Sequence, residues 1–280
     1  MRTTHRKGLS VAELIVGMVI LGIIGMGLTK VMVSQARYFD HQKQANLARN
    51  VSRGPLNRLV SDIRMVEAEG GVTAVTTTAI TSRVPYAIGV VCNSDATGTN
   101  ISLLPVDSAM YAEPGYSGFA WRNGASKFRY VMGGATPTAG SLSACNTAGI
   151  NTLTTQLAKV IRISPALVDS ADVGSPVFLL RNIKYEFKAS TLVPNGTGLY
   201  RTVVATGASE ELSAPYASGA SFKFFVGSAL AAVTSPPADL STLRGIELNM
   251  TGLSEKKPRQ AVAQETAPFV TAVFFKNRLN

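Results

Sequence analysis

An unbroken apolar segment near the N-terminus is followed by a segment with only one apolar face. Residues 9–29 contain a single charged side chain, that of Glu13. A helix of about 21 residues, rising about 1.5 Å per residue, matches the roughly 30 Å hydrocarbon core of a bilayer. From Ser34 onward the chain is polar, but apolar residues recur at helical spacing. They are Leu47, Val51, Leu56, Leu59, Val60, Ile63 and Val66.

This pattern predicts one long helix over residues 9–65, with a membrane half at 9–30 and an amphipathic continuation at 31–66. Proline lacks a backbone donor and clashes with the preceding turn, so Gly54-Pro55 should kink or locally break the helix. The charged residues of the second half are expected largely on its other faces. They are Arg49, Arg53, Arg58, Asp62 and Arg64.

The remaining residues, 67–280, predict one β-rich domain, long enough for a moderate core or for a core with an insertion. Up to about residue 176 the chain is rich in Ala, Gly, Ser and Thr, which indicates irregular β structure with long loops. The expected strands of this part are 72–80, 83–91, 101–104, 127–132 and 159–163. Their order cannot be deduced from the sequence.

The last third shows clearer strand patterning. Ile183, Tyr185 and Phe187 alternate with charged residues, as in a strand with one buried face. Further strands are expected at 199–206, 221–226, 244–251 and 269–276, separated by turn signals at 194–196, 214–215 and 235–237. Short connections favour an antiparallel sheet. The predicted class is therefore α+β, with the apolar stripe of the helix packed on an antiparallel sheet that carries irregular β insertions.

The residues that precede the apolar segment are also distinctive. Arg2, Arg6 and Lys7 come first and favour a cytoplasmic N-terminus. Gly8 then stands directly before the apolar run, and Glu13 lies five residues beyond it. An ordinary secretory signal has a shorter apolar core and a small-residue cleavage site after that core. Here the well-placed small residue comes before the run, so cleavage would leave the apolar helix on the mature protein.

The motif Arg6-Lys7-Gly8-Leu9-Ser10-Val11-Ala12-Glu13-Leu14-Ile15 resembles the prepilin signal of type IV pilins and type II secretion pseudopilins. The resemblance implies that a prepilin peptidase removes residues 1–8 by cutting after Gly8, and usually methylates the new N-terminus at Leu9. It further implies a pilin-like fold and a single-pass protein of the bacterial inner membrane with a periplasmic domain at 67–280. The mature helix would then pack against other minor and major pilins in a pilus or pseudopilus.

Glu13 has two interpretations. An acid within a membrane segment is unfavourable, by roughly 2.5–3.5 kcal/mol at mid-helix, although near the helix end its carboxylate can reach the interface. It is therefore either a tolerated acid or, as the resemblance implies, a docking group. In the second case its carboxylate pairs with the free amine of a neighbouring subunit's first residue, Leu9.

Shorter motifs resemble PilW-type minor pilins and J-type pseudopilins. They are Arg58–Met65 near the end of the helix, Gly198-Leu199-Tyr200-Arg201, Leu243-Arg244-Gly245-Ile246-Glu247-Leu248 and the terminal 273–279. The leading hypothesis is a minor pilin that takes part in type IV pilus assembly, in a priming or tip complex. One alternative is a J-type minor pseudopilin of type II secretion. Another is a pilus-tip subunit that binds DNA or a surface, which an exposed cluster around Trp121, Arg122, Lys127 and Arg129 would favour.

The charge balance adds little to this choice. The chain has 27 Lys and Arg against 17 Asp and Glu, a formal net charge of +10, to which the leader contributes three positive charges. A basic domain can favour DNA, anionic lipid or acidic partners. The densest group, Lys256-Lys257-Pro258-Arg259, is short and has the composition of a solvated surface loop, so nucleic-acid binding is weakly supported.

The two cysteines and the scarcity of histidine limit the chemistry. In an oxidising compartment Cys92 and Cys145 favour one disulfide, the alternative being two buried thiols. The mature chain has one histidine, His41, which excludes a site of three His ligands. No G-x-S-x-G, phosphate-loop or dinucleotide motif stands out. We therefore expect no metal, no cofactor and no enzymatic activity.

Overall fold

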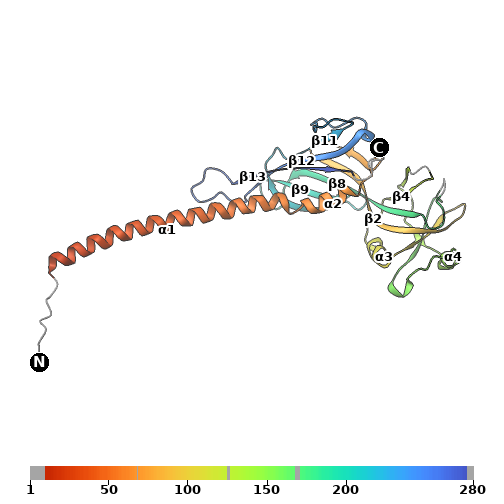
Figure 1. Ribbon diagram of the computed structural model, residues 1–280, viewed down its shortest axis with the longest axis horizontal. Helices are drawn as coiled ribbons and strands as arrows, with labels where there is room; N and C mark the ends of the chain where they lie inside the picture. The colour runs from red at the N-terminus through yellow and green to blue at the C-terminus, as the bar shows by residue number, and fades with distance from the viewer. Residues whose placement is uncertain (1–9, 68, 125–126, 168–170, 276–280) are drawn as a thin grey trace, which may run out of the picture.

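A long helix projects from a β-sheet domain in the computed structural model, which describes residues 10–67, 69–124, 127–167 and 171–275 (Figure 1). The helix runs as α1 (Val11–Arg53) and continues after a break as α2 (Leu56–Arg64). The break lies at Gly54-Pro55, as predicted. Pro55 has no N–H to donate to the carbonyl of Val51, and two side chains of the domain replace that bond. The Ser213 hydroxyl and the Tyr216 hydroxyl donate to the Val51 oxygen at 2.6 and 2.7 Å.

The domain consists of antiparallel strands with short helices between them. The strands of its first part are β1 (Val72–Val75), β2 (Ala79–Ser94), β3 (Thr99–Leu103), β4 (Gly118–Arg122), β5 (Phe128–Met132), β6 (Thr138–Ala139) and β7 (Val160–Ile163). Those of its second part are β8 (Pro176–Ala189), β9 (Thr197–Val203), β10 (Ala208–Tyr216), β11 (Ser221–Val226), β12 (Leu243–Leu253) and β13 (Thr266–Phe274). The short helices are α3 (Pro105–Ala112), α4 (Leu142–Thr147) and two 3₁₀ turns, Thr154–Gln156 and Leu240–Thr242.

All strand pairs of the described chain belong to one sheet, whose main path is β11-β12-β10-β9-β8-β2-β3-β7-β6. The other strands branch from it: β1 pairs with β2, β13 with β12, β4 with β8, and β5 with β4. The antiparallel arrangement confirms the prediction from short connections. Together with the helix it gives the α+β layout expected from the sequence.

The two longest strands, β2 and β8, connect two hydrophobic cores. They pair from Ala79↔Glu186 to Val90↔Pro176. At one end their buried side chains join Leu59 and Ile63 of α2, and Val66 just after it, in the first core. At the other end they join a second core that excludes the helix and lies farthest from the N-terminus (Figure 1). The alternation of Ile183, Tyr185 and Phe187 into the first core is as predicted.

Several element predictions were wrong in detail. The expected strand 72–80 is two strands, since Thr76 forms a turn with Ala79 through hydrogen bonds in both directions. Strand β10 was missed, and Ala214-Pro215, expected to separate strands, lies inside it. The sequence of β10 is polar, and the strand ends against the helix. Its position therefore depends on partners distant in the chain and not on its own hydrophobic pattern.

Candidate functional site: the exposed apolar helix

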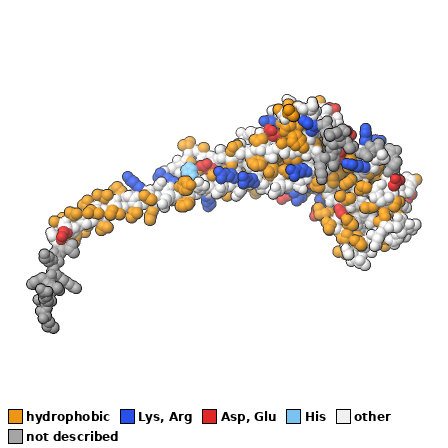
Figure 2. All heavy atoms as spheres, viewed as in Figure 1, with side chains coloured by type: hydrophobic (Ala, Val, Ile, Leu, Met, Phe, Trp, Pro, Cys, Tyr) orange, Lys and Arg blue, Asp and Glu red, His pale blue; other side chains and the backbone are white. Residues whose placement is uncertain are grey.

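Within the described part of the chain, the N-terminal half of α1 is not covered by the domain. Its best 18-residue window has a mean hydropathy of 2.4 and is 0% buried, so this helix is long and apolar enough to cross a membrane. Large apolar side chains stay exposed from Val11 to Val33, and Figure 2 shows them along the projecting stem. A continuous apolar surface of this size marks a membrane or protein interaction site.

Ser10 and Glu13 begin the helix with a capping box. The backbone N–H of Ala12 donates to the Ser10 hydroxyl at 3.3 Å, and the Glu13 carboxylate accepts from the Ser10 N–H at 2.9 Å. Two amides that lack partners within the helix are satisfied in this way. The carboxylate also lies at the positive end of the helix dipole.

This geometry leaves Glu13 able to accept a further donor. A carboxylate offers about four lone-pair sites on two oxygens, and only one oxygen is used by the Ser10 N–H among the bonds of the described residues. The carboxylate is thus held at the end of the helix rather than swinging freely. Gly8 and Leu9, the predicted processing residues, lie outside the described residues.

The helix meets the domain on a face of small and polar residues. Gln44, Ala48 and Ser52 are the buried residues of α1. Ala48 and Ser52 face Gly252 of β12, where an added Cβ would lie only 2.2 Å from the Ala48 carbonyl oxygen. Leu47, predicted in the apolar stripe, is instead 40% exposed. The close approach to glycine selects small side chains at this point, and hydrophobic periodicity does not detect that.

Farther along, a buried ion pair joins the helix to the sheet. Asp62, expected on an outer face, is buried and its carboxylate accepts from the Tyr185 hydroxyl at 2.7 Å and from Arg201 Nε at 3.0 Å. Burial and the Asp62 charge together raise the pKa of Tyr185, so its hydroxyl remains a donor. The sequence showed an acid on an amphipathic helix, but its partners come from β8 and β9.

A loop of the domain also holds the helix closer to its apolar half. The loop between β12 and β13 extends alongside α1 (Figure 1). The Arg259 N–H donates to the Asp40 carboxylate at 2.7 Å, and His41 Nδ1 lies 2.8 Å from the Glu265 carboxylate. Hydrogen bonding to Arg259 lowers the pKa of Asp40. The helix is therefore attached to the domain from Asp40 onward and projects freely before it.

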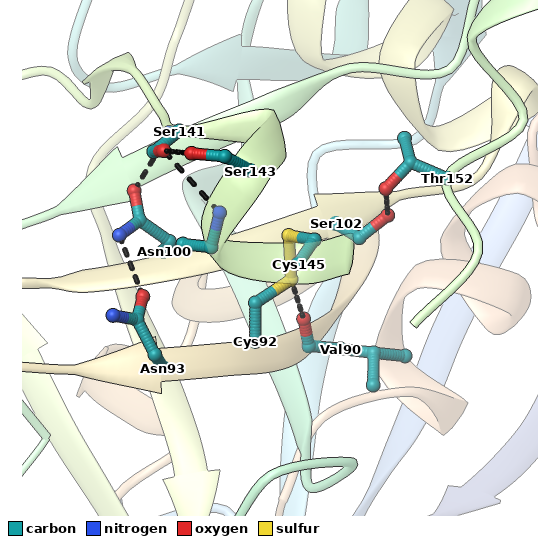
Figure 3. The surroundings of a disulfide bond; sticks show 10 residues. Val90, Cys92, Asn93, Asn100, Ser102, Ser141, Ser143, Cys145 and Thr152 are labelled. Carbon is teal, nitrogen blue, oxygen red and sulfur yellow. Dashed lines mark hydrogen bonds between the residues drawn. A yellow bond between two sulfur atoms is a disulfide. The ribbon is translucent and has the colours of Figure 1, made fainter. Parts of the chain in front are cut away.

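A disulfide joins Cys92 of β2 to Cys145 of α4, with a Cα–Cα distance of 4.6 Å (Figure 3). Both cysteines are buried. Neighbouring hydrogen bonds tie the same segments together, since the Asn100 side chain donates to Asn93 at 2.7 Å and accepts from the Ser141 N–H at 3.0 Å. The bond closes a loop with a sequence separation of 53. A loop of this length corresponds to about 4 kcal/mol on the chain-entropy model.

Only part of the cluster that would favour a ligand-binding tip is exposed: Arg122, Lys127 and Arg129 are exposed, whereas Trp121 is not. Trp121 is 2% exposed and belongs to the second core. Arg122 lies with its guanidinium 4.9 Å from the centre of the Phe128 ring. No group of three or more His, Cys, Asp or Glu that could hold a metal ion occurs in the described part of the chain.

No protein-family model, no curated protein and no solved structure matches the chain. Its function is therefore inferred from its own residues and geometry.

Proposed function

We propose that this protein is a minor pilin that takes part in type IV pilus assembly, in a priming or tip complex, after prepilin peptidase removes residues 1–8. The observation that carries the proposal is the projecting helix, whose apolar half is 0% buried against its own domain. Such a surface needs an apolar environment supplied from outside the chain. A bilayer supplies it before assembly, and the helices of other pilins supply it in a filament.

Glu13 is the proposed docking residue. Its carboxylate is held at the first turn of the helix by the Ser10 N–H. The amine of Leu9 on a neighbouring subunit would neutralise this charge in an environment where an isolated charge is costly. The pair forms only when the two helices are in one relative position along the axis. It therefore selects a single docking depth for each new subunit.

The proposed location is the inner membrane, with the leader on the cytoplasmic side and the domain in the periplasm. The basic residues before the apolar segment support this orientation. The bonded cysteines are in keeping with an oxidising compartment. Burial of Trp121 argues against a role in DNA or surface binding through the cluster around it.

A clean deletion strain tests the proposal, with sheared surface pili and secreted proteins measured in the same cultures. Lost pili with normal secretion, restored by the wild-type gene, are the expected result. Normal pili with lost secretion would replace the proposal by the J-type pseudopilin. Unchanged pili and unchanged secretion would contradict any essential role in assembly.

A further inference from the structure

Two cations of the stem lie on the side of α1 that carries the domain. Gln44, Ala48 and Ser52 define this side, because they are the buried residues of the helix. Lys30 and Arg37 precede Ala48 by about five and about three whole turns at 3.6 residues per turn. Both therefore lie on the face of the helix that becomes the contact surface of the domain farther along, ahead of the point where the loop attaches.

The loop that follows β12 places three more cations above this face. Lys256, Lys257 and Arg259 are all exposed. The loop is not free, since the Arg259 N–H binds Asp40 and the Ser254 hydroxyl donates to the Lys256 carbonyl at 2.7 Å. Its cationic side chains are thus held next to the stem at a defined height.

Cations outnumber acids in this region, whose loop also carries the exposed Glu255. From residue 14 to residue 61 the helix has six Lys and Arg side chains but one acid, Asp40, whose carboxylate is occupied by the loop. The carboxylate of Glu265 lies 2.8 Å from His41 Nδ1. Among the described residues, none of Lys30, Arg37, Lys256 and Lys257 forms a salt bridge. Figure 2 shows Lys and Arg side chains along the stem between its apolar half and the domain.

The height of these cations matches a lipid headgroup layer. Exposed large apolar residues continue without a long gap to Val33. Asp40, where the loop attaches, lies about 10 Å farther along the helix axis. The headgroup region adds about 5–8 Å on each side of the hydrocarbon core, and charges act over a Debye length of about 8–10 Å. Membrane placement of the apolar half therefore brings the loop within about a Debye length of the phosphates.

We propose that Lys30, Arg37, Lys256, Lys257 and Arg259 form a cationic surface that binds the phosphates of anionic phospholipid headgroups. The domain is thereby docked on the membrane through its underside, instead of pivoting above it on the helix. Lysine and arginine are the side chains that recognise phosphate. The inference rests on the membrane placement of α1 in the proposed function, and it is independent of pilus assembly.

The test uses the full chain in nanodiscs of phosphatidylcholine, or of phosphatidylcholine with one third phosphatidylglycerol, with a trace of headgroup-quencher lipid in each. A fluorophore is attached at V262C, because Val262 is 91% exposed on the same loop and both native cysteines are bonded. We expect stronger quenching in the anionic discs, and its loss at high salt. The ratio of docked to undocked loop should fall about fivefold for each charge removed.

The charge variant is K256Q/K257Q/R259Q, which keeps the backbone bond of residue 259 to Asp40. Its matched control is R122Q/K127Q/K159Q, which removes three charges from the exposed surface of the distal part. Loss of quenching in the charge variant, but not in the control variant, supports the proposal. Equal quenching in both lipids, or equal effects of the two variants, would overturn it. The proposal would also be overturned if a DNA duplex bound the protein in neutral discs while anionic lipid had no effect on the quenching. Failure of the chain to enter discs would contradict the membrane placement itself.

Discussion

Replacing Gly252 by alanine should push the helix slightly away from the sheet and weaken their contact. The added methyl group would lie 2.2 Å from the Ala48 carbonyl oxygen and 2.7 Å from Ser52 Oγ. Because Cβ atoms essentially never approach other heavy atoms closer than 3.0 Å, the helix must withdraw by about 1 Å. A gap of that size forfeits a quarter to a half of each affected dispersion contact. The expected cost is about 1–3 kcal/mol.

For a domain of this size the corresponding fall in Tm is roughly 2–12 °C. It is measured by thermal unfolding of the full chain in mild detergent, followed by near-UV circular dichroism. The matched control is Gly219→Ala, since a Cβ at Gly219 meets nothing within 4 Å. That variant should be neutral or slightly stabilising. Equal stability of the two variants would refute close helix–sheet contact at Gly252.

Four further results are expected. Replacing Gly8 by a bulky residue should leave an uncleaved precursor on an immunoblot; normal mature protein would disprove the cleavage site. Glu13→Gln keeps the capping acceptor but removes the charge, so cleavage and folding should persist while incorporation into sheared filaments falls; unchanged incorporation would show the charge to be dispensable. Asp62→Ala leaves the largely buried Arg201 uncompensated and should cost up to about 3–5 kcal/mol in denaturant unfolding, whereas a loss below about 1 kcal/mol would contradict the pair. Tyr216→Phe removes one of the two hydroxyl donors to the Val51 carbonyl and should cost about 1 kcal/mol of stability at neutral pH. Burial raises the pKa of Tyr216 to about 12, so its hydroxyl is protonated under these conditions.

Elements whose burial follows from their own local sequence pattern could be predicted. The apolar half of the helix follows from one uncharged run, and its break follows from the missing N–H of Pro55. Strand β11 has the predicted bounds, Ser221–Val226. The alternation at Ile183–Phe187 likewise predicted which face of β8 is buried. In each case a local pattern is enough, because the solvent or the core selects residues by hydrophobicity alone.

The sequence by itself therefore determined a projecting apolar helix with an acid in its first turn, and an antiparallel sheet behind it. Only the tertiary structure decided which residues around Ala48 on α1 meet that sheet. Ala48, and not Leu47, forms the contact with the sheet, because the helix backbone lies too close to Gly252 for a larger side chain. Asp62 became buried because Tyr185 and Arg201 offset the cost of removing its charge from water. Such partners lie more than a hundred residues away, and the energy of each contact depends on both sides at once.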